Sequence, residues 1–472
     1  MNLKTITQYS LGPVGSALLG FVTLPMITWH FSPDDVGRLS MLFIAQSFIM
    51  ILFSLGLDQS YIRYYYSSKN VGQLFKDCIT PGLTLFITIS LILYIFDPTL
   101  LSFILFGIQD STLTSLTLVC ILVTYLQRFL SLIIRMQENA FLFSLSQFLP
   151  KVFFLIYFLL IISFEGASGF LYLLLGQLVS NLLMFLYLLY ENKEEIYKAI
   201  STKFSLKDFS EYFVYGLPLS IGALAYWGLT AADKFFLRAY SSLNELGVYS
   251  VAISFATAAI IFQKVFTTIW TPYVYKTIND RYDDSEIRNI NKYVVLFVVV
   301  IMSLLGGGSW LIDYVLPSEY TSVKYLVLPC MLAPLFYVLS ETTVVGLNIV
   351  KKTNYSMLAS IFAFIMNVVG NYFLVKMYGA YGAAISTAVS FWIFLVLRTE
   401  LSCYFWKSIP RTRLYILTLL LLIASIVTVI VTSLFIILIW SALLLFVMIF
   451  FYKDFLTVFS LIKNNNHKRK GD

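Results

Sequence analysis

Charged residues are scarce in this sequence. Asp, Glu, Lys and Arg make up 12% of the 472 residues, whereas 59% are hydrophobic and the mean hydropathy is +0.84. Soluble domains carry about 25% charged residues, so this composition excludes an ordinary soluble protein. The apolar runs exceed the ~20 residues that cross a bilayer as a helix, and they are too long for transmembrane strands. The sequence therefore predicts an all-α integral membrane protein.

The sequence also has few residues that could bind a metal. His30 and His467 are its only histidines, and each is isolated. A zinc or haem site would have almost no ligands to use, and free cysteine usually behaves as a small apolar side chain. We therefore predict no metal site and no cofactor. The cysteines, none of them in a C-x-x-C pair, are Cys78, Cys120, Cys330 and Cys403.

Three motifs of other membrane proteins are missing as well. The sequence has no Walker A loop, no arginine at every third position and no TVGYG-like filter. These absences argue against ATP hydrolysis by that route, a voltage sensor and a potassium channel. A membrane glycosyltransferase or polymerase is the less favoured reading, because the longest outer loop, near residues 97–114, holds only Asp97 and Asp110 as carboxylates. We expect a transporter and not an enzyme.

About fourteen apolar segments are long enough to cross a membrane. Lys and Arg crowd alternate loops and are rare in the others, which places both termini in the cytoplasm. The net charge of +7 is thus a topology signal and not a sign of nucleic-acid binding. The segments run near residues 9–29, 39–57, 78–96, 115–136, 141–163, 168–190, 212–232, 247–272, 293–313, 325–349, 355–375, 380–405, 412–432 and 434–452.

One short pattern occurs twice, at residues 32–40 and 242–250, and a second pair lies at 166–169 and 379–382. The offsets of 210 and 213 residues are nearly equal and span six segments, which indicates a parallel repeat of the kind found in transporters. All copies fall in outer loops, so we interpret them as turns that set lobe geometry. The predicted parts are two six-helix lobes, 1–195 and 196–408, then two further helices and a basic cytoplasmic tail in 409–472.

Several short motifs follow one another in a recognisable order. In that order, and with fourteen spans, they resemble the polysaccharide-transporter branch of the multidrug/oligosaccharidyl-lipid/polysaccharide (MOP) exporter superfamily, and within it the O-antigen and repeat-unit flippases. The resemblance covers essentially the whole chain and implies a MATE-like, V-shaped fold. Lys234 departs from the arginine common in that family, which keeps the charge and loses the guanidinium fork. The motifs are Pro13 and residues 32–37, 56–59, 63–65, 215–218, 233–234 and 378–384.

The resemblance implies a flippase. Its substrate would be an undecaprenyl-diphosphate-linked oligosaccharide, moved from the inner to the outer leaflet of the bacterial inner membrane for O-antigen, capsule or exopolysaccharide assembly. Its other partners would be membrane lipids and the polysaccharide polymerase with its chain-length machinery. Two related lobes suggest alternating access around a central cavity, with H⁺ or Na⁺ as the open choices of coupling ion. Because a diphosphate crosses hydrocarbon only at great cost, we expect that cavity to be cationic.

Ionisable side chains inside the spans are the candidate site residues, because charges in a membrane are costly and usually functional. Lys151 follows Pro150 near the middle of its span, where snorkelling to the surface is difficult, and Arg128 lies deeper than Arg135. The substrate-binding candidates are Lys151, Arg128, Lys264, Lys234, Arg63 and Arg135. The candidates for ion coupling or gating are Asp58, Asp233 and Glu341.

Structural interpretations compete with these roles. Lys264 and Glu341 could pair with each other, Asp58 and Arg63 could cap a span, and the tyrosines at 64–66 are typical of an interfacial belt. Asp233 and Lys234 could likewise form an ion pair at the outer interface. The alternative function is a multidrug or organic-ion antiporter of the same superfamily. Such antiporters favour acidic first-lobe sites, whereas the buried charge of the fourth and fifth spans is basic here.

Overall fold

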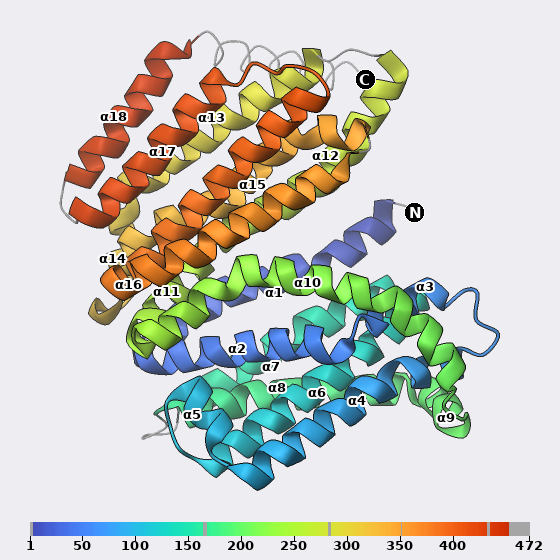
Figure 1. Ribbon diagram of the computed structural model, residues 1–472. Coiled ribbons are helices and arrows are strands. Elements are labelled where there is room, and N and C mark those ends of the chain that lie inside the picture. The colour runs from blue at the N-terminus through green and yellow to red at the C-terminus, as the bar shows by residue number, and fades with distance from the viewer. Residues whose placement is uncertain (1–2, 164–167, 282–284, 351, 432–434, 453–472) are drawn as a thin grey trace. The chain divides into compact units, whose positions relative to one another are not determined.

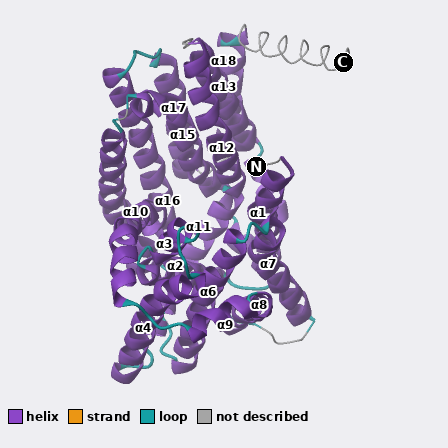
Figure 2. Ribbon diagram, turned by 90° about the vertical axis from the view of Figure 1, so that its right-hand side faces the viewer, coloured by secondary structure: helices purple, strands orange, loops and turns teal. Residues whose placement is uncertain are grey.

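The computed structural model describes residues 3–163, 168–281, 285–350, 352–431 and 435–452. Within these residues, every regular element is a helix (Figure 2), as the composition predicts. The helices group into two compact units, Met1–Ser250 and Val251–Asp472. Each unit is described here by itself.

Figure 1 labels the helices in chain order. Those that begin in the first unit are α1 (Leu3–Thr28), α2 (Pro33–Ser54), α3 (Leu57–Tyr64), α4 (Val71–Phe96), α5 (Leu100–Phe106), α6 (Ser111–Met136), α7 (Ala140–Ile162), α8 (Phe170–Glu191), α9 (Lys193–Ser201), α10 (Leu206–Tyr240) and α11 (Leu243–Phe255). The second unit holds α12 (Thr257–Arg281), α13 (Ser285–Gly307), α14 (Ile312–Val315), α15 (Val323–Ile349), α16 (Thr353–Phe405), α17 (Thr412–Val431) and α18 (Phe435–Phe450), with short 3₁₀ turns at Ser309–Leu311 and Ser318–Tyr320.

Each of the fourteen predicted spans falls on a helix. By length and composition, nine described helices could cross a membrane, or up to eleven if each bent pair is one span. The turn expected between the eleventh and twelfth spans lies within α16, where two helices meet at Gly379, whose φ is 53°. Glycine adopts that conformation at little cost. The Ser386 hydroxyl donates to the Asn367 carbonyl at 3.1 Å across this turn, so the chain reverses its direction there. The eighth span is the pair α11 and α12, bent by 45°, and the turn expected at residues 432–433 lies outside the described residues.

The repeated motif at residues 32–40 forms the start of α2. Ser32 caps the helix, because its hydroxyl accepts from the backbone N–H of Asp35, and Pro33 occupies the first turn. The guanidinium of Arg38 then binds the Asp35 carboxylate at 2.9 Å. The motif is therefore a helix-start signal, which agrees with its interpretation as a structural turn.

The first unit has an aromatic core, and polar side chains beside this core connect three of its helices. Phe53 and Tyr125 are among its buried members. Beside them, the Gln46 amide of α2 donates to the Thr124 hydroxyl of α6 at 3.1 Å, and the Asn181 amide of α8 donates to the same hydroxyl at 3.4 Å. In a membrane, where lipid offers no hydrogen bonds, such contacts tie helices together.

The second unit is built around α15, which is buried over most of its length. The two last helices are held to the same unit by Trp440 of α18. Its indole N–H donates to the Thr428 hydroxyl of α17 at 2.9 Å, and its ring lies where a Cβ on Gly306 of α13 would be. The helices α17 and α18, which lie outside the predicted repeat, are therefore packed against α13.

The boundary between the two compact units does not coincide with the predicted boundary between the two lobes. α10 and the first part of α11 group with the first unit, whereas the sequence assigns their spans to the second lobe. Contacts of α10 with α2, α3 and α4 account for this grouping. The lobe boundaries near residues 195 and 408 remain predictions.

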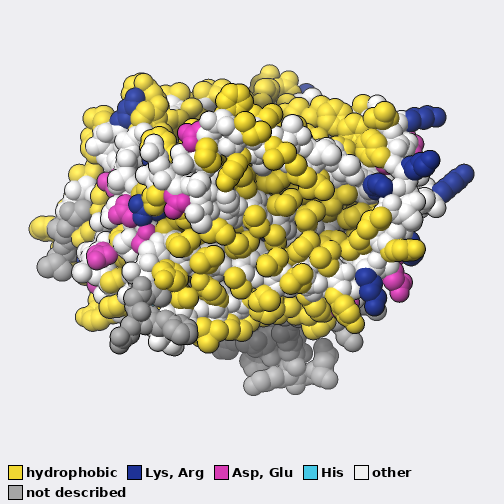
Figure 3. Space-filling model, turned by 90° about the horizontal axis from the view of Figure 1, so that it is seen from below, with side chains coloured by type: hydrophobic (Ala, Val, Ile, Leu, Met, Phe, Trp, Pro, Cys, Tyr) yellow, Lys and Arg dark blue, Asp and Glu magenta, His cyan; other side chains and the backbone are white. Residues whose placement is uncertain are grey.

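The face in Figure 3 has a broad area of hydrophobic side chains, with many Lys and Arg at its right-hand edge and others beside Asp and Glu on its left. Exposed aliphatic residues of α4, such as Leu91 and Ile95, are typical of a lipid-facing surface. The separation of charge from the apolar area agrees with a multi-pass membrane protein. The side on which each terminus lies remains a prediction.

Candidate functional site

The second predicted span is broken, and the break carries charged side chains. α2 ends where Leu55 and Gly56 both take left-handed backbone conformations, with φ of 51° and 74°. The short helix α3 then begins at Leu57. A Cβ on Gly56 would overlap the carbonyl of Gly216 in α10, and a Cβ on Gly216 would overlap Gly56. The structure thus brings together two motifs, at 56–59 and 215–218, that are far apart in the sequence.

Asp58 in the first turn of α3 binds Arg128 of α6. The guanidinium Nη2 lies 3.1 Å from the Asp58 Oδ2, and the Gln59 amide donates to that same oxygen at 2.9 Å. The Arg128 side chain is 36% exposed, whereas that of Asp58 is 12% exposed. One carboxylate oxygen therefore holds an arginine that still presents part of its guanidinium to the surroundings. Asp58 is therefore the ion-pair partner of an arginine on another helix, and it does more than cap the end of a span.

Lys151 lies midway along α7, as the sequence predicts, and its side chain is half-buried. Its ammonium lies 4.9 Å from the centre of the Phe43 ring of α2, a cation–π contact. Across the described part of the chain, no carboxylate forms an ion pair with it. Lys151 is therefore a partly buried cation that contacts an aromatic ring and has no ion pair among the described residues.

Three other candidate cations are exposed. Arg63 ends α3, and Arg135 lies in the last turn of α6, where it covers the ring of Phe143 at 5.8 Å. Lys264 of α12 is exposed as well. The interfacial interpretation of Arg135 therefore agrees with its position.

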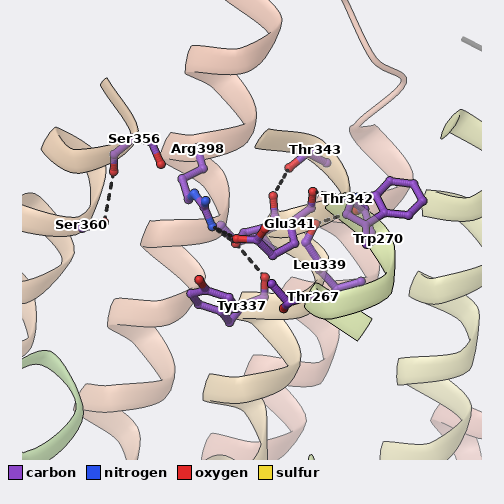
Figure 4. Close-up of polar contacts among 12 residues, drawn as sticks. Thr267, Trp270, Tyr337, Leu339, Glu341, Thr342, Thr343, Ser356, Ser360 and Arg398 are labelled. Carbon is purple, nitrogen blue, oxygen red and sulfur yellow. Dashed lines mark hydrogen bonds and ion pairs between the residues drawn. The ribbon is translucent and has the colours of Figure 1, made fainter. Parts of the chain in front are cut away.

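Glu341 of α15 is paired with Arg398 of α16 (Figure 4). The Nη1 of Arg398 lies 2.8 Å from the carboxylate and 2.7 Å from the Ser340 hydroxyl. The guanidinium also covers the Phe394 ring at 4.8 Å. The two side chains are only 9% and 10% exposed, so this ion pair is sealed, unlike the one at Asp58. Trp270 of α12 donates its indole N–H to the Glu341 carbonyl at 2.9 Å.

Arg398 is the site residue that sequence reasoning missed, since Glu341 was considered as a partner of Lys264. The sequence held one indication that the position of Glu341 matters. Arg128 and Glu341 are 213 residues apart, the same offset that separates the second pair of repeated motifs. The fourth span of each half therefore carries an ion-pair member at the equivalent position, with opposite charge.

Asp233 and Lys234 lie in the C-terminal part of α10, beyond a 48° bend between Leu224 and Trp227. Asp233 is buried and accepts a hydrogen bond from the Tyr249 hydroxyl of α11. Its carboxylate also accepts from the backbone N–H of Lys234 at 2.8 Å. This carboxylate therefore joins α10 to α11.

The two copies of the repeated motif contact each other. A Cβ on Gly37 would overlap the Leu243 carbonyl, and a Cβ on Gly247 would overlap the Pro33 carbonyl. The contact is reciprocal, as expected when two related helices cross about a local two-fold axis. Backbones can approach this closely only where small residues meet.

The two arginines of the predicted outer loops have structural partners beside this crossing. Arg38 donates its Nε hydrogen to the Phe106 carbonyl at 3.2 Å, and Arg238 donates to the carbonyls of Leu105 and Phe103 at 3.1 and 2.9 Å. These carbonyls end the short helix α5, where cations are favourable. Neither arginine was a candidate site residue.

Among the residues that the structure describes, no group of three or more His, Cys, Asp and Glu side chains could hold a metal ion. The first unit holds the ion pair Asp58–Arg128, and the second unit holds the ion pair Glu341–Arg398. The first unit thus offers two cationic groups inside its helices, the Lys151 ammonium and the exposed part of the Arg128 guanidinium.

Comparison with known proteins identifies the family. A family model described as polysaccharide biosynthesis protein matches residues 3–278, more than half of the chain. Comparison with curated sequences finds no match. The fold is similar to that of the lipid II flippase MurJ in its inward closed conformation, with a TM-score of 0.69, 16% identity, and 95% of this chain and 99% of that chain covered.

Two structures of multidrug resistance MATE family transporters of the MOP superfamily are also similar. The inward-facing one has a TM-score of 0.57 and the outward-facing one 0.52, each with 16% identity and with 88% of this chain and 96% of that chain covered. Identities this low establish a shared fold alone. The chain is therefore a multi-span membrane protein with the fold of these transporters, and it belongs to the polysaccharide biosynthesis protein family.

Proposed function

We propose that this protein is a flippase for a lipid-linked oligosaccharide. It would move an undecaprenyl-diphosphate-linked repeat unit from the inner to the outer leaflet of the bacterial inner membrane by alternating access, for O-antigen, capsule or exopolysaccharide assembly. In this proposal both termini are cytoplasmic and the protein carries out no catalysis. The proposal is in keeping with the family, whose members serve polysaccharide biosynthesis.

The observation that carries the proposal is the position of Lys151. A lysine at the centre of a membrane helix costs roughly 3 kcal/mol on insertion scales. Here the cation–π contact with Phe43 offsets only part of that cost. An anionic headgroup that passes Lys151 would supply the missing counter-charge, so the ammonium is suited to bind a diphosphate during its passage.

Arg128 supports the same assignment. It shares one carboxylate oxygen with Gln59 and keeps part of its guanidinium exposed. A guanidinium binds phosphate oxygens through two parallel hydrogen bonds, which a single carboxylate oxygen does not satisfy. We propose that an arriving diphosphate competes with Asp58 for Arg128.

The acidic candidates speak against a transporter of organic cations. Asp58 is bound to Arg128, Asp233 to the Tyr249 hydroxyl and Glu341 to Arg398. A cationic substrate would have to displace an arginine from two of these carboxylates. Coupling to H⁺ or Na⁺ through one of the three remains part of the proposal, as does a link to a polysaccharide polymerase.

Deletion of the gene, followed by analysis of lipid-linked intermediates, tests the proposal. Flipping predicts that a complete repeat unit accumulates on the inner leaflet, because synthesis continues while export stops. Complementation with the wild-type chain should clear the accumulated lipid. If the deletion instead yields a shortened repeat unit, the protein is a transferase and the proposal fails.

A further inference from the structure

Three tyrosines form a cluster that the proposed function does not yet use. The ring of Tyr64, at the end of α3, lies 4.9 Å from that of Tyr212 and 5.9 Å from that of Tyr215, both in the first turns of α10. The sequence suggests that residues 64–66 form an interfacial belt. Tyr65 packs on the buried Tyr61 with ring centres 5.6 Å apart. The three consecutive tyrosines therefore serve different contacts.

The cluster is held in place by the contacts between α3 and α10. The Ser60 hydroxyl donates to the Tyr212 carbonyl at 2.7 Å, and Gly56 meets Gly216 backbone to backbone. These two contacts fix the register of the short helix α3 against α10. The aromatic rings are consequently presented on a rigid support, as binding sites require.

Polar groups border the cluster. The Glu211 carboxylate lies near the Tyr64 hydroxyl, and partial burial together with this carboxylate raises the pKa of Tyr64. Glu211 and Arg63 are exposed, and the Tyr215 side chain is 39% exposed. The hydroxyl of a belt tyrosine is normally left to interfacial water, whereas that of Tyr64 lies near a protein carboxylate. An exposed ring beside a carboxylate and a guanidinium has the chemistry that recognises a sugar.

A pyranose has one face of C–H groups and a rim of hydroxyls. The C–H face packs on the electron-rich face of an aromatic ring, and carboxylate and guanidinium groups bind the hydroxyls through charge-assisted hydrogen bonds. Tyr215 supplies the ring, and Glu211 and Arg63 supply the polar groups. We infer that this cluster, Tyr64, Tyr212 and Tyr215 with Glu211 and Arg63, binds a sugar ring of the headgroup.

The inference rests on the proposed function and assigns the sugar a place relative to the diphosphate. Asp58, which holds Arg128, and Tyr64 are both on α3, six residues apart. At ~1.5 Å per residue, they are separated by about 9 Å along the helix axis. A sugar joined directly to a diphosphate could therefore lie at the tyrosine cluster while the phosphates contact Arg128.

Binding of two probes to the full-length protein in lipid nanodiscs tests this inference. The probes are undecaprenyl diphosphate and the same lipid carrying one N-acetylglucosamine. Tyr215→Ala should weaken binding of the sugar-bearing probe roughly three- to tenfold, the range expected for one aromatic contact. It should leave undecaprenyl diphosphate within about twofold of wild type. Tyr215→Phe, which keeps the ring, should bind both probes as wild type does.

Tyr240→Ala, at an exposed tyrosine in the last turn of the same helix, is the matched control and should change neither affinity. The inference is overturned, with the proposed function intact, if Tyr215→Ala binds the sugar-bearing probe normally or loses both probes equally. A wild-type protein that binds neither probe would overturn the proposed function together with the inference.

Discussion

The hydroxyl groups of Ser40 and Ser250 form a hydrogen bond at 2.7 Å, although 210 residues separate them in the chain. They occupy the same place in the two copies of the repeated motif. With the reciprocal contact of Gly37 and Gly247, they define a symmetric crossing of α2 and α11. In the predicted topology this crossing lies on the outer side, so a substrate leaving for the outer leaflet would require it to open.

A disulfide at this crossing should stop transport. Cysteines at Ser40 and Ser250 would bring two sulfur atoms close to bonding distance, because the oxygens that they replace are 2.7 Å apart. We expect oxidation of Ser40→Cys/Ser250→Cys to abolish glycan export and a reductant to restore it. Each single cysteine variant serves as the control and should export normally. Normal export by the cross-linked protein would show that the crossing does not open.

Added bulk at the crossing should destabilise the protein. Gly37→Ala places a methyl group on the Leu243 carbonyl, and overpacking of this kind costs about 1–3 kcal/mol. The matched control is Gly222→Ala, because a Cβ there meets nothing within 4 Å. Thermal unfolding of the purified proteins in detergent should show a lower Tm for Gly37→Ala only. Equal Tm values for the two variants would contradict the close approach.

The Glu341–Arg398 ion pair should stabilise the protein only while both partners are present. Glu341→Gln leaves the Arg398 guanidinium sealed in the second unit without a counter-charge, which typically costs about 3–5 kcal/mol. Replacing both residues, as Glu341→Gln/Arg398→Met, removes that charge and should recover much of the lost Tm. If Glu341→Gln instead keeps the wild-type Tm and abolishes transport alone, the carboxylate is a coupling residue and the structural interpretation is wrong.

The packing of α18 should depend on the absence of a side chain at Gly306. The Trp440 indole fills the place of a side chain there and is completely buried. Gly306→Ala should therefore displace α18 and lower the Tm, with a cost of about 1–3 kcal/mol for overpacking. Gly307→Ala, at a neighbouring position with nothing within 4 Å, is the control. A Gly306→Ala protein as stable as this control would argue against the docking of α18.

Local patterns were sufficient to predict much of the fold. Apolar runs located the helices, because a helix that crosses lipid must satisfy its own backbone and be apolar along its length. Of the fourteen predicted spans, nine to eleven are matched by described helices that could cross a membrane. The turn at Gly379 follows the glycine-rich pattern of residues 379–382, because glycine adopts the left-handed backbone that such a turn needs. The break after Ser54 was not resolved, since Leu55 carries no signal for its left-handed backbone.

The site was predicted less completely, because pairing between helices is a long-range property. Depth along a span identified Lys151, Arg128 and Glu341 as charges within the apolar segments. Their partners could not be read from spacing: Asp58 is 70 residues from Arg128, and Arg398 is 57 residues from Glu341. The contact between Gly37 and Gly247 could likewise not be predicted, although the repeated motif that contains both glycines can be recognised in the sequence.

Transport of a lipid-linked oligosaccharide by Lys151→Ala proteoliposomes is the most direct test of the central claim. The substrate is a fluorescent undecaprenyl-diphosphate oligosaccharide, and a membrane-impermeant reagent reports the amount in the outer leaflet. Wild type and Lys151→Arg, which keeps the charge, should flip the lipid. Lys151→Ala, inserted at the same level and with an unchanged Tm, should lose most of the activity. Flipping by Lys151→Ala at the wild-type rate would contradict the account.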